Sequence, residues 1–545
     1  MNKIYRVLAF YTFLFSVVSV TTLSINYVEG DDASGVLYHL CGRNLAIQSP
    51  YSSYNSGLDF LLNFLNPNEV ELRNFSIVIS FIFSYLVLCV LAILIDMLLM
   101  STKTNTKYWF LCLIPFIIPD FIFTGLIVNS TNISFTLVLI STIFYFKYLK
   151  LSNRWFFVLS IVFMGLSIPF RWSMIIYYPF FCSIILFNND YSITESLKQI
   201  KPLIVFYCLS FFFGIILIYA TGYGLIDFID IVIWGKKYMD SSDKSIVSTI
   251  AVALSFFTIP LTILLFFGFK VFFANFKRHF LGKFLFLILP LTPYFILGLF
   301  IAYKYSITVI PILIFISLIG FIKIYENKYL LSFFILTIAA IWLVGIEVDV
   351  NNTIFGSGYG YKKNISTNNQ IISERNLDSR LKINKILPNF DAGFYIPTPE
   401  GPRPLFGYFY VIFGGLWKKD IDKQAQVRYF VVEELIRNKN IFLMQDRQTA
   451  FLECDLYKYG YKTKSKFILN KNNTFEVRTF VNQKDTININ VIAPGVSKAD
   501  FSLNFLQKNK NIIFRSSYSS LIYNALSRDK SLKNLDVYTI YKKQN

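Results

Sequence analysis

Two adjacent carboxylates, Asp31 and Asp32, follow the first apolar segment of the chain. A lipid headgroup lies at that depth, and a carboxylate there can accept the proton of an incoming hydroxyl as a general base. A structural role suits the same residues, because Asp is a preferred N-cap and a carboxylate stabilises the positive end of a helix. Asp31 and Asp32 are therefore candidates for either general-base catalysis or helix capping.

The segment after these carboxylates predicts a short helix along the membrane surface. Val36, Leu37 and Leu40 would share its apolar face, and Gly42 would end it. His39 would lie on this helix, either orienting a substrate or as an ordinary polar residue. The other candidate substrate-binding residues of this region are Glu29, Arg43 and Tyr54.

Two cations at the outer ends of apolar runs, Arg171 and Lys304, suit a lipid phosphate. Charge-assisted hydrogen bonds to phosphate are among the strongest that a side chain makes. The alternative is that each long side chain only extends to the membrane interface. Pro169 predicts a broken helix just before Arg171. Lys236 and Lys237, in an amphipathic stretch, would bind phosphate or anionic lipid, or form a solvated basic face.

The composition places these residues in a membrane protein. Of 545 residues, 54% are hydrophobic and 16% are charged, and the mean hydropathy is +0.51. A composition with so many hydrophobic and so few charged residues excludes a soluble enzyme, a disordered chain and a fibrous repeat. Apolar runs of about 20 residues, the length that crosses the hydrocarbon core, predict a polytopic α-helical protein. Eleven such runs lie at residues 7–26, 75–99, 108–128, 132–147, 155–169, 172–187, 203–221, 247–269, 284–302, 306–322 and 329–348.

Lys and Arg residues in the short connections predict the orientation of these spans. With the N-terminus in the cytoplasm, the inner connections hold 15 Lys and Arg residues and the outer connections hold seven. An odd number of spans then places the C-terminal region outside, together with small outer turns at 129–131 and around Arg171.

Lys3 and Arg6 before an apolar stretch are typical of a signal peptide, and we expect a retained signal anchor because no convincing cleavage site follows.

The hydropathy divides the chain into a membrane-embedded module, residues 1–348, and a hydrophilic domain, residues 349–545. The module has a first outer loop at residues 26–73. The hydrophilic domain holds 30 Lys and Arg residues against 17 Asp and Glu residues, which is +13 of the chain's net charge of +19. A basic outer surface attracts acidic glycans, lipid-linked saccharides or phospholipid headgroups, so we predict membrane lipids and saccharides as partners and no nucleic acid.

The hydrophilic domain is predicted to be an α/β or α+β domain. Residues 422–438 have helical spacing, and a Pro-rich turn lies at 397–404. Strands are predicted at 441–444, 466–469, 474–481 and 487–492.

Three stretches together resemble the GT-C superfamily of integral-membrane glycosyltransferases. The first is the acidic pair in the first outer loop, followed by the segment Gln48-Ser49-Pro50-Tyr51-Ser52-Ser53-Tyr54. The second is Gly165-Leu166-Ser167-Ile168-Pro169-Phe170-Arg171-Trp172, followed by Tyr178-Pro179. The third is Tyr303-Lys304-Tyr305 before Pro311, which is similar to a motif of bacterial aminoarabinose and protein mannosyl transferases. The resemblance covers about the first 350 residues as an architecture.

This resemblance implies a polyprenyl-phosphate-linked sugar donor and inverting transfer to a glycan, lipid or protein acceptor outside the cytoplasm of a bacterial inner membrane. Asp31 or Asp32 would be the base, Arg171 and Lys304 would contact the donor phosphate, and Tyr305 would contact substrate. A second acidic position of the family corresponds to Asp120, after Pro119. No His, Cys, Asp or Glu residues have the sequence spacing of a recognisable metal-binding motif, and no cofactor is predicted. A divalent cation at the acidic pair, as in oligosaccharyltransferase relatives, stays open.

Two other classes of function remain as alternatives. A transporter or flippase for a lipid-linked saccharide would need ionisable groups within the bilayer, and the spans after the third have none near their centres. A surface-glycan polymerase or ligase would use the same kind of donor lipid, but its large outer loop falls late in the span order. The early acidic loop favours the glycosyltransferase.

Overall fold

The computed structural model of the chain describes its helical part and separate short segments near the C-terminus. The described residues are 2–22, 57–58, 61, 69–99, 105–126, 130–221, 257–274, 279–293, 309–344, 395–398, 401–404, 408–413, 436, 440–443, 456, 459–463, 468–469, 476–481, 485–491, 512–514 and 537–539.

Helices occupy all or part of each predicted apolar run. They are α1 (Asn2–Thr22), α5 (Glu69–Leu98), α6 (Asn105–Ile117), α7 (Asp120–Phe123), η2 (Thr124–Leu126), α8 (Ser130–Leu151), α9 (Arg154–Phe170), η3 (Trp172–Tyr177), α10 (Tyr178–Asn188), α11 (Ile193–Leu197), α12 (Ile200–Ala220), α15 (Ile259–Phe273), α16 (Phe280–Ile288), η4 (Leu289–Leu291), α18 (Ile310–Tyr325) and α19 (Lys328–Leu343).

Four of the described helices are long and apolar enough to cross a membrane, which is consistent with a membrane protein. They are the segments Lys3–Val20, Val78–Leu98, Ser130–Leu151 and Ile200–Ala220. A fifth span results if Asn105–Ile117 and Asp120–Leu126, which meet at a bend of 62°, are counted as one. Shorter apolar helices of 10–17 residues lie in the other predicted runs. The total of eleven spans therefore stays a prediction.

The first helix packs within the helical bundle, and its retention as a signal anchor stays a prediction. Tyr11 is fully buried, and its hydroxyl donates a hydrogen bond to the backbone oxygen of Leu111 in α6. Phe15 packs against Phe81 of α5, with ring centroids 5.1 Å apart. These contacts stabilise α1 against two other helices, so its removal would leave buried surface exposed.

Two adjustments to the predicted boundaries concern the outer connections. α5 has 30 residues and begins at Glu69, inside the predicted loop 26–73. At 1.5 Å per residue it is about 45 Å long, more than the hydrocarbon core requires. Ser130 and Thr131, predicted in an outer turn, form the first turn of α8 and are fully buried. The predicted turn therefore belongs to the start of α8.

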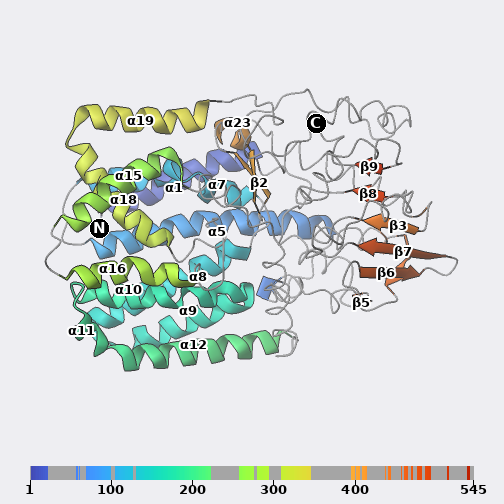
Figure 1. Cartoon of the computed structure of the whole chain (residues 1–545), viewed down its shortest axis with the longest axis horizontal. Helices are drawn as coiled ribbons and strands as arrows, with labels where there is room; N and C mark the ends of the chain where they lie inside the picture. The colour runs from blue at the N-terminus through green and yellow to red at the C-terminus, as the bar shows by residue number, and fades with distance from the viewer. Residues whose placement is uncertain are drawn as a thin grey trace, which may run out of the picture.

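The N-terminus and α11 lie at one end of the helical bundle, and strands β3, β6, β7, β8 and β9 lie beyond the opposite end (Figure 1). Lysines at the first end pair with carboxylates. Lys107 lies 2.6 Å from Asp96, and Lys323 lies 2.7 Å from Glu326. The predicted sidedness of the Lys and Arg residues stays a prediction.

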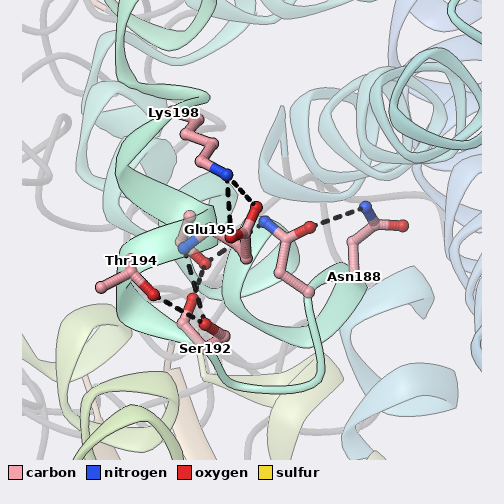
Figure 2. Close-up of polar contacts among 7 residues, drawn as sticks. Asn188, Ser192, Thr194, Glu195 and Lys198 are labelled. Atoms are coloured by element: carbon pink, nitrogen blue, oxygen red, sulfur yellow. Dashed lines mark hydrogen bonds and ion pairs between the residues drawn. The ribbon is translucent and has the colours of Figure 1, made fainter.

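The turn into α11 at this end carries a self-contained polar network (Figure 2). Ser192 caps α11 by accepting a hydrogen bond from the backbone N–H of Glu195. Lys198 reaches both carboxylate oxygens of Glu195, at 2.7 and 2.8 Å. Both members of this ion pair are exposed, so it orders the turn more than it stabilises the fold.

The described C-terminal segments include two sheets. β1 (Tyr395–Thr398) pairs with β2 (Gly401–Pro404), so the predicted Pro-rich turn lies within a hairpin. The second is a seven-stranded mixed sheet of order β4-β6-β7-β3-β8-β9, with β5 also pairing with β6. Its strands are β3 (Asn440–Leu443), β4 (Lys462–Thr463), β5 (Ile468–Leu469), β6 (Glu476–Val481), β7 (Thr486–Val491), β8 (Ile512–Phe514) and β9 (Val537–Thr539).

Strands lie in each of the four predicted strand segments, whereas β4, β8 and β9 were not predicted. These three strands have two or three residues each, too few for an alternating pattern to stand out. The predicted helix at 422–438 lies almost wholly outside the described residues. The α/β or α+β domain as a folded unit thus stays a prediction.

A short helix, α23 (Tyr408–Ile412), joins the C-terminal region to the bundle. Tyr408 is fully buried, and its ring centroid lies 5.9 Å from that of Trp342 in α19. The indole N–H of Trp342 donates to the backbone oxygen of Phe116 in α6, at 2.9 Å. The C-terminal ends of α6 and α19 and the helix α23 therefore meet in one packed cluster.

Candidate functional site

Arg171 is placed by a break in the helical bundle. Pro169 lies in the last turn of α9, and Arg171 follows with extended backbone angles, φ −162° and ψ 103°. Its backbone N–H still donates to the oxygen of Ser167, at 3.1 Å, and its backbone oxygen accepts from Met174 in η3, at 3.0 Å. Arg171 therefore sits at a sharp junction between α9 and η3, as the Pro-bearing sequence predicts.

The guanidinium of Arg171 is buried within the bundle. The residue has 0% exposed surface, and its Nη1 donates a hydrogen bond to Thr131 Oγ1, at 2.6 Å. The alternative that Arg171 merely extends to the membrane interface is wrong for this structure, because such a side chain keeps its charged end exposed. A buried cation is costly unless polar groups surround it, so the fold must supply them.

The first turn of α8 supplies such groups. Ser130, Thr131 and Asn132 are all fully buried there. The N–H groups at the start of a helix lack partners within the helix and carry the positive end of its dipole. Hydroxyls, the backbone N–H groups of a helix start and a guanidinium are groups that can bind a phosphate or carboxylate.

Asp120 lies on the other segment that reaches this turn. It begins α7 directly after Pro119, at the 62° bend, and is 1% exposed. Thr124 Oγ1 donates to the backbone oxygen of Asp120, at 2.7 Å, and accepts from Asn132 Nδ2, at 3.4 Å. Thr124 thus joins the segment that bears Asp120 to the residue next to Thr131, the partner of Arg171.

Close packing fixes the segment after Asp120 against α5. The hydroxyl of Ser84 in α5 donates to the backbone oxygen of Phe121. A Cβ at Gly125 would lie 2.7 Å from the Cβ of Ser84, too close for any other residue without a shift of the backbone. α5, α7, η2 and α8 are therefore held together around the candidate site.

The first outer loop also reaches this place. Gly57 and Leu58 are buried, and a Cβ at Gly57 would lie 3.1 Å from both the nitrogen of Phe170 and the carbonyl carbon of Pro169. These two residues directly precede Arg171. A part of the loop predicted to carry the acidic pair is thus in contact with the α9–η3 junction.

Of the candidate site residues, Asp120 and Arg171 are described, and the first turn of α8 brings their segments together. The other candidates, Glu29, Asp31, Asp32, His39, Arg43, Tyr54, Lys236, Lys237, Lys304 and Tyr305, lie outside the described residues. Among the residues that the structure does describe, no group of three or more His, Cys, Asp or Glu side chains could hold a metal ion. The acidic pair, where a divalent cation was left open, is not among them.

Thr131, Asn132 and Thr124 were not predicted as site residues. The run of small polar residues from Asn129 to Asn132 interrupts the apolar pattern, and this interruption could have indicated a polar site at the start of α8. Their pairing with Arg171 and Asp120 joins residues from different spans, which a single sequence does not reveal.

A comparison with models of known protein families finds no match for this chain. A comparison with curated proteins likewise finds no match. The site consists of a buried cation, hydroxyls at a helix start and a buried carboxylate on the segment that Thr124 joins to that helix. It lies at the end of the bundle away from the N-terminus.

Proposed function

We propose that this protein is an integral-membrane glycosyltransferase that moves a sugar from a polyprenyl-phosphate donor to an acceptor outside the cytoplasm. The observation that carries this proposal is the buried guanidinium of Arg171 beside the first turn of α8. The donor's phosphate would bind there, because a helix start and a guanidinium both favour an anion. Lys304 would provide the second cation of the phosphate site, and Tyr305 beside it would contact the substrate.

In the proposed reaction, Asp31 or Asp32 takes the proton of the acceptor hydroxyl. The hydroxyl oxygen then attacks the anomeric carbon of the sugar from the face opposite the phosphate. The bond between that carbon and the phosphate oxygen breaks, and the electron pair leaves with the polyprenyl phosphate. Arg171 and Lys304 stabilise the growing negative charge of the leaving group, which is where most of the rate acceleration arises. The sugar is transferred with inversion of configuration.

Access to Arg171 requires a local rearrangement, because the residue is fully covered. Gly57 and Leu58 of the first outer loop pack on the residues just before it. We propose that donor binding displaces this contact and so uncovers the guanidinium.

In vitro transfer from a radiolabelled polyprenyl-phosphate sugar tests the role of the acidic pair. Asp31→Asn and Asp32→Asn keep the size of each side chain and remove its basicity. We expect one of the two to reduce kcat by about two to four orders of magnitude. Lys201→Gln, at the N-terminal end of the bundle, is the matched control and should transfer at the wild-type rate. Full activity in both Asp variants would contradict the base assignment.

A transporter for a lipid-linked saccharide is a second candidate. Asp120 and Arg171 are buried charged residues, which is the kind of group that such a function would use. Proteoliposomes loaded with a labelled lipid-linked saccharide separate the two functions: a transporter moves the intact molecule across the bilayer, whereas a glycosyltransferase releases polyprenyl phosphate only when an acceptor is present.

A further inference from the structure

The turn between α8 and α9 gathers three cations at the N-terminal end of the bundle. Lys147 and Lys150 lie one turn apart near the end of α8, and Arg154 begins α9 after a connection of two residues. No Asp or Glu occurs anywhere between Asp120 and Asp190. The turn therefore has a local charge of +3 that no neighbouring residue in the sequence offsets.

Three other lysines at this end of the bundle are paired with carboxylates. Lys107, Lys198 and Lys323 each lie within 2.7 Å of a carboxylate oxygen. For Lys147, Lys150 and Arg154, the described part of the chain provides no such carboxylate. Their charge is thus available to an anion from outside the protein.

Aromatic rings fix where two of these cations lie. The Lys147 ammonium lies 5.5 Å from the ring centroid of Phe156 and 6.0 Å from that of Phe144, and these two rings are stacked. The Lys150 ammonium lies 5.5 Å from the ring centroid of Phe146. Cation–π contacts of this kind hold an ammonium in place while leaving its N–H groups free to donate.

Large apolar side chains flank the same turn. Leu151 is 65% exposed and Trp155 is 74% exposed, on either side of the connection. Exposed Trp beside Lys and Arg at the end of a spanning helix is typical of the boundary between acyl chains and headgroups. The turn therefore combines groups that suit both parts of a phospholipid.

We propose that the α8–α9 turn binds the headgroup of an anionic phospholipid. Lys147, Lys150 and Arg154 would bind the phosphate and the negative charge of the headgroup, and Leu151 and Trp155 would contact its glycerol and upper acyl chains. This inference does not depend on the proposed enzymatic activity, because it concerns the opposite end of the bundle from Arg171.

Native mass spectrometry of the purified full chain in mild detergent tests the proposal. The protein is titrated separately with phosphatidylglycerol, phosphatidylcholine and glycerol phosphate. We expect wild type to retain phosphatidylglycerol in preference to phosphatidylcholine and to retain no glycerol phosphate. Each cation near an anionic lipid contributes about fivefold in affinity. The double variant Lys150→Gln with Arg154→Gln, which changes two exposed side chains, should therefore bind phosphatidylglycerol about 25-fold more weakly.

The control is the double variant Lys198→Gln with Lys323→Gln, which removes two paired lysines at the same end of the bundle. It should keep wild-type binding, and all variants are checked for an unchanged melting temperature without added lipid. Unaltered phosphatidylglycerol binding in the Lys150 and Arg154 variant would overturn the proposal. Equal loss in the control would do the same, since it would show a general charge effect and not a site. Binding of glycerol phosphate as strong as that of the lipid would make the ligand a free phosphate.

Discussion

At the scale of the residue, the buried Arg171 has the largest consequence for stability and function. A fully buried guanidinium cannot exchange its hydrogen bonds for water, so each partner that it loses leaves part of a charge unsatisfied. Thr131 is its described partner, at 2.6 Å. The hydroxyl therefore holds the guanidinium in place for any anion that binds at the first turn of α8.

Thr131→Val should lower the free energy of unfolding by about 1.5–3 kcal/mol, the usual contribution of a hydrogen bond to a charged group. The change preserves the shape of the side chain and removes only the hydroxyl. Thr131→Ser should restore most of the loss. Thr337→Val is a matched control, because the hydroxyl of Thr337 donates within its own helix to Phe334. Thermal unfolding in detergent measures the effect, and equal stability of the two Val variants would show that the bond to Arg171 is unimportant.

At the scale of the element, helices α15 and α18 cross with almost no space between their backbones. A Cβ at Gly268 would lie 2.1 Å from the backbone oxygen of Ile316, and one at Gly320 would lie 2.0 Å from that of Leu264. No side chain tolerates such distances, so any larger residue must separate the two helices. This crossing is a rigid contact of the second half of the bundle.

Gly268→Val should therefore destabilise the protein by at least about 1–3 kcal/mol, the range for overpacked sites. The helix propensity of Val in a membrane helix does not offset this cost, because the clash is with backbone. Phe266→Leu, on the exposed face of the same helix, is the control and should change stability little. Differential scanning fluorimetry of the two variants would detect the difference, and a Gly268→Val protein as stable as wild type would refute the close crossing.

The positions of these elements could be predicted from the sequence better than their contacts. Hydropathy located a helix in every apolar run, and Pro169 predicted the break before Arg171. The hydrogen bond from Arg171 to Thr131 joins residues 40 positions apart. The pair Lys107 and Asp96 was likewise not predicted, because Lys107 was assigned to an inner connection without a partner. Hydropathy reports which segments are apolar, but it carries no information on which polar side chains on different helices face each other.

At the scale of the whole molecule, the protein is polarised along its long axis (Figure 1). The N-terminus and the paired lysines lie at one end, and the main β-sheet lies beyond the other. The aromatic cluster of Trp342, Phe116 and Tyr408 connects the C-terminal region to the helices. That these two ends of the bundle face opposite sides of a membrane stays a prediction.

The contact between α23 and α19 should matter for the attachment of the C-terminal region. Tyr408→Ala removes a fully buried ring and should cost about 3–5 kcal/mol where the site cannot collapse. We expect limited proteolysis to cut the variant near α23 faster than wild type. Phe409→Ala, at an exposed neighbouring position, should be cut at the wild-type rate. Equal cleavage of both variants would contradict an anchoring role for Tyr408.

The predicted membrane topology can be tested by cysteine labelling. Single cysteines introduced at residues 355–370 should react with a membrane-impermeant maleimide in intact cells, whereas Ser152→Cys, in the exposed α8–α9 turn, should react only after the cells are opened. The chain without an introduced cysteine provides the background. Labelling of Ser152→Cys in intact cells, or protection of residues 355–370, would reverse the orientation and place Arg171 on the cytoplasmic side.

The most direct test of the central claim, that Arg171 binds the donor phosphate, is kcat/KM for transfer from a polyprenyl-phosphate sugar in Arg171→Lys and in Lys201→Gln. Lys keeps the charge of Arg171 but cannot reproduce its planar set of donors. We predict a fall of about 10²–10³-fold for Arg171→Lys, the effect of removing one preorganised donor to a developing anion, and wild-type kinetics for Lys201→Gln. Wild-type kcat/KM in a correctly folded Arg171→Lys protein would contradict the account.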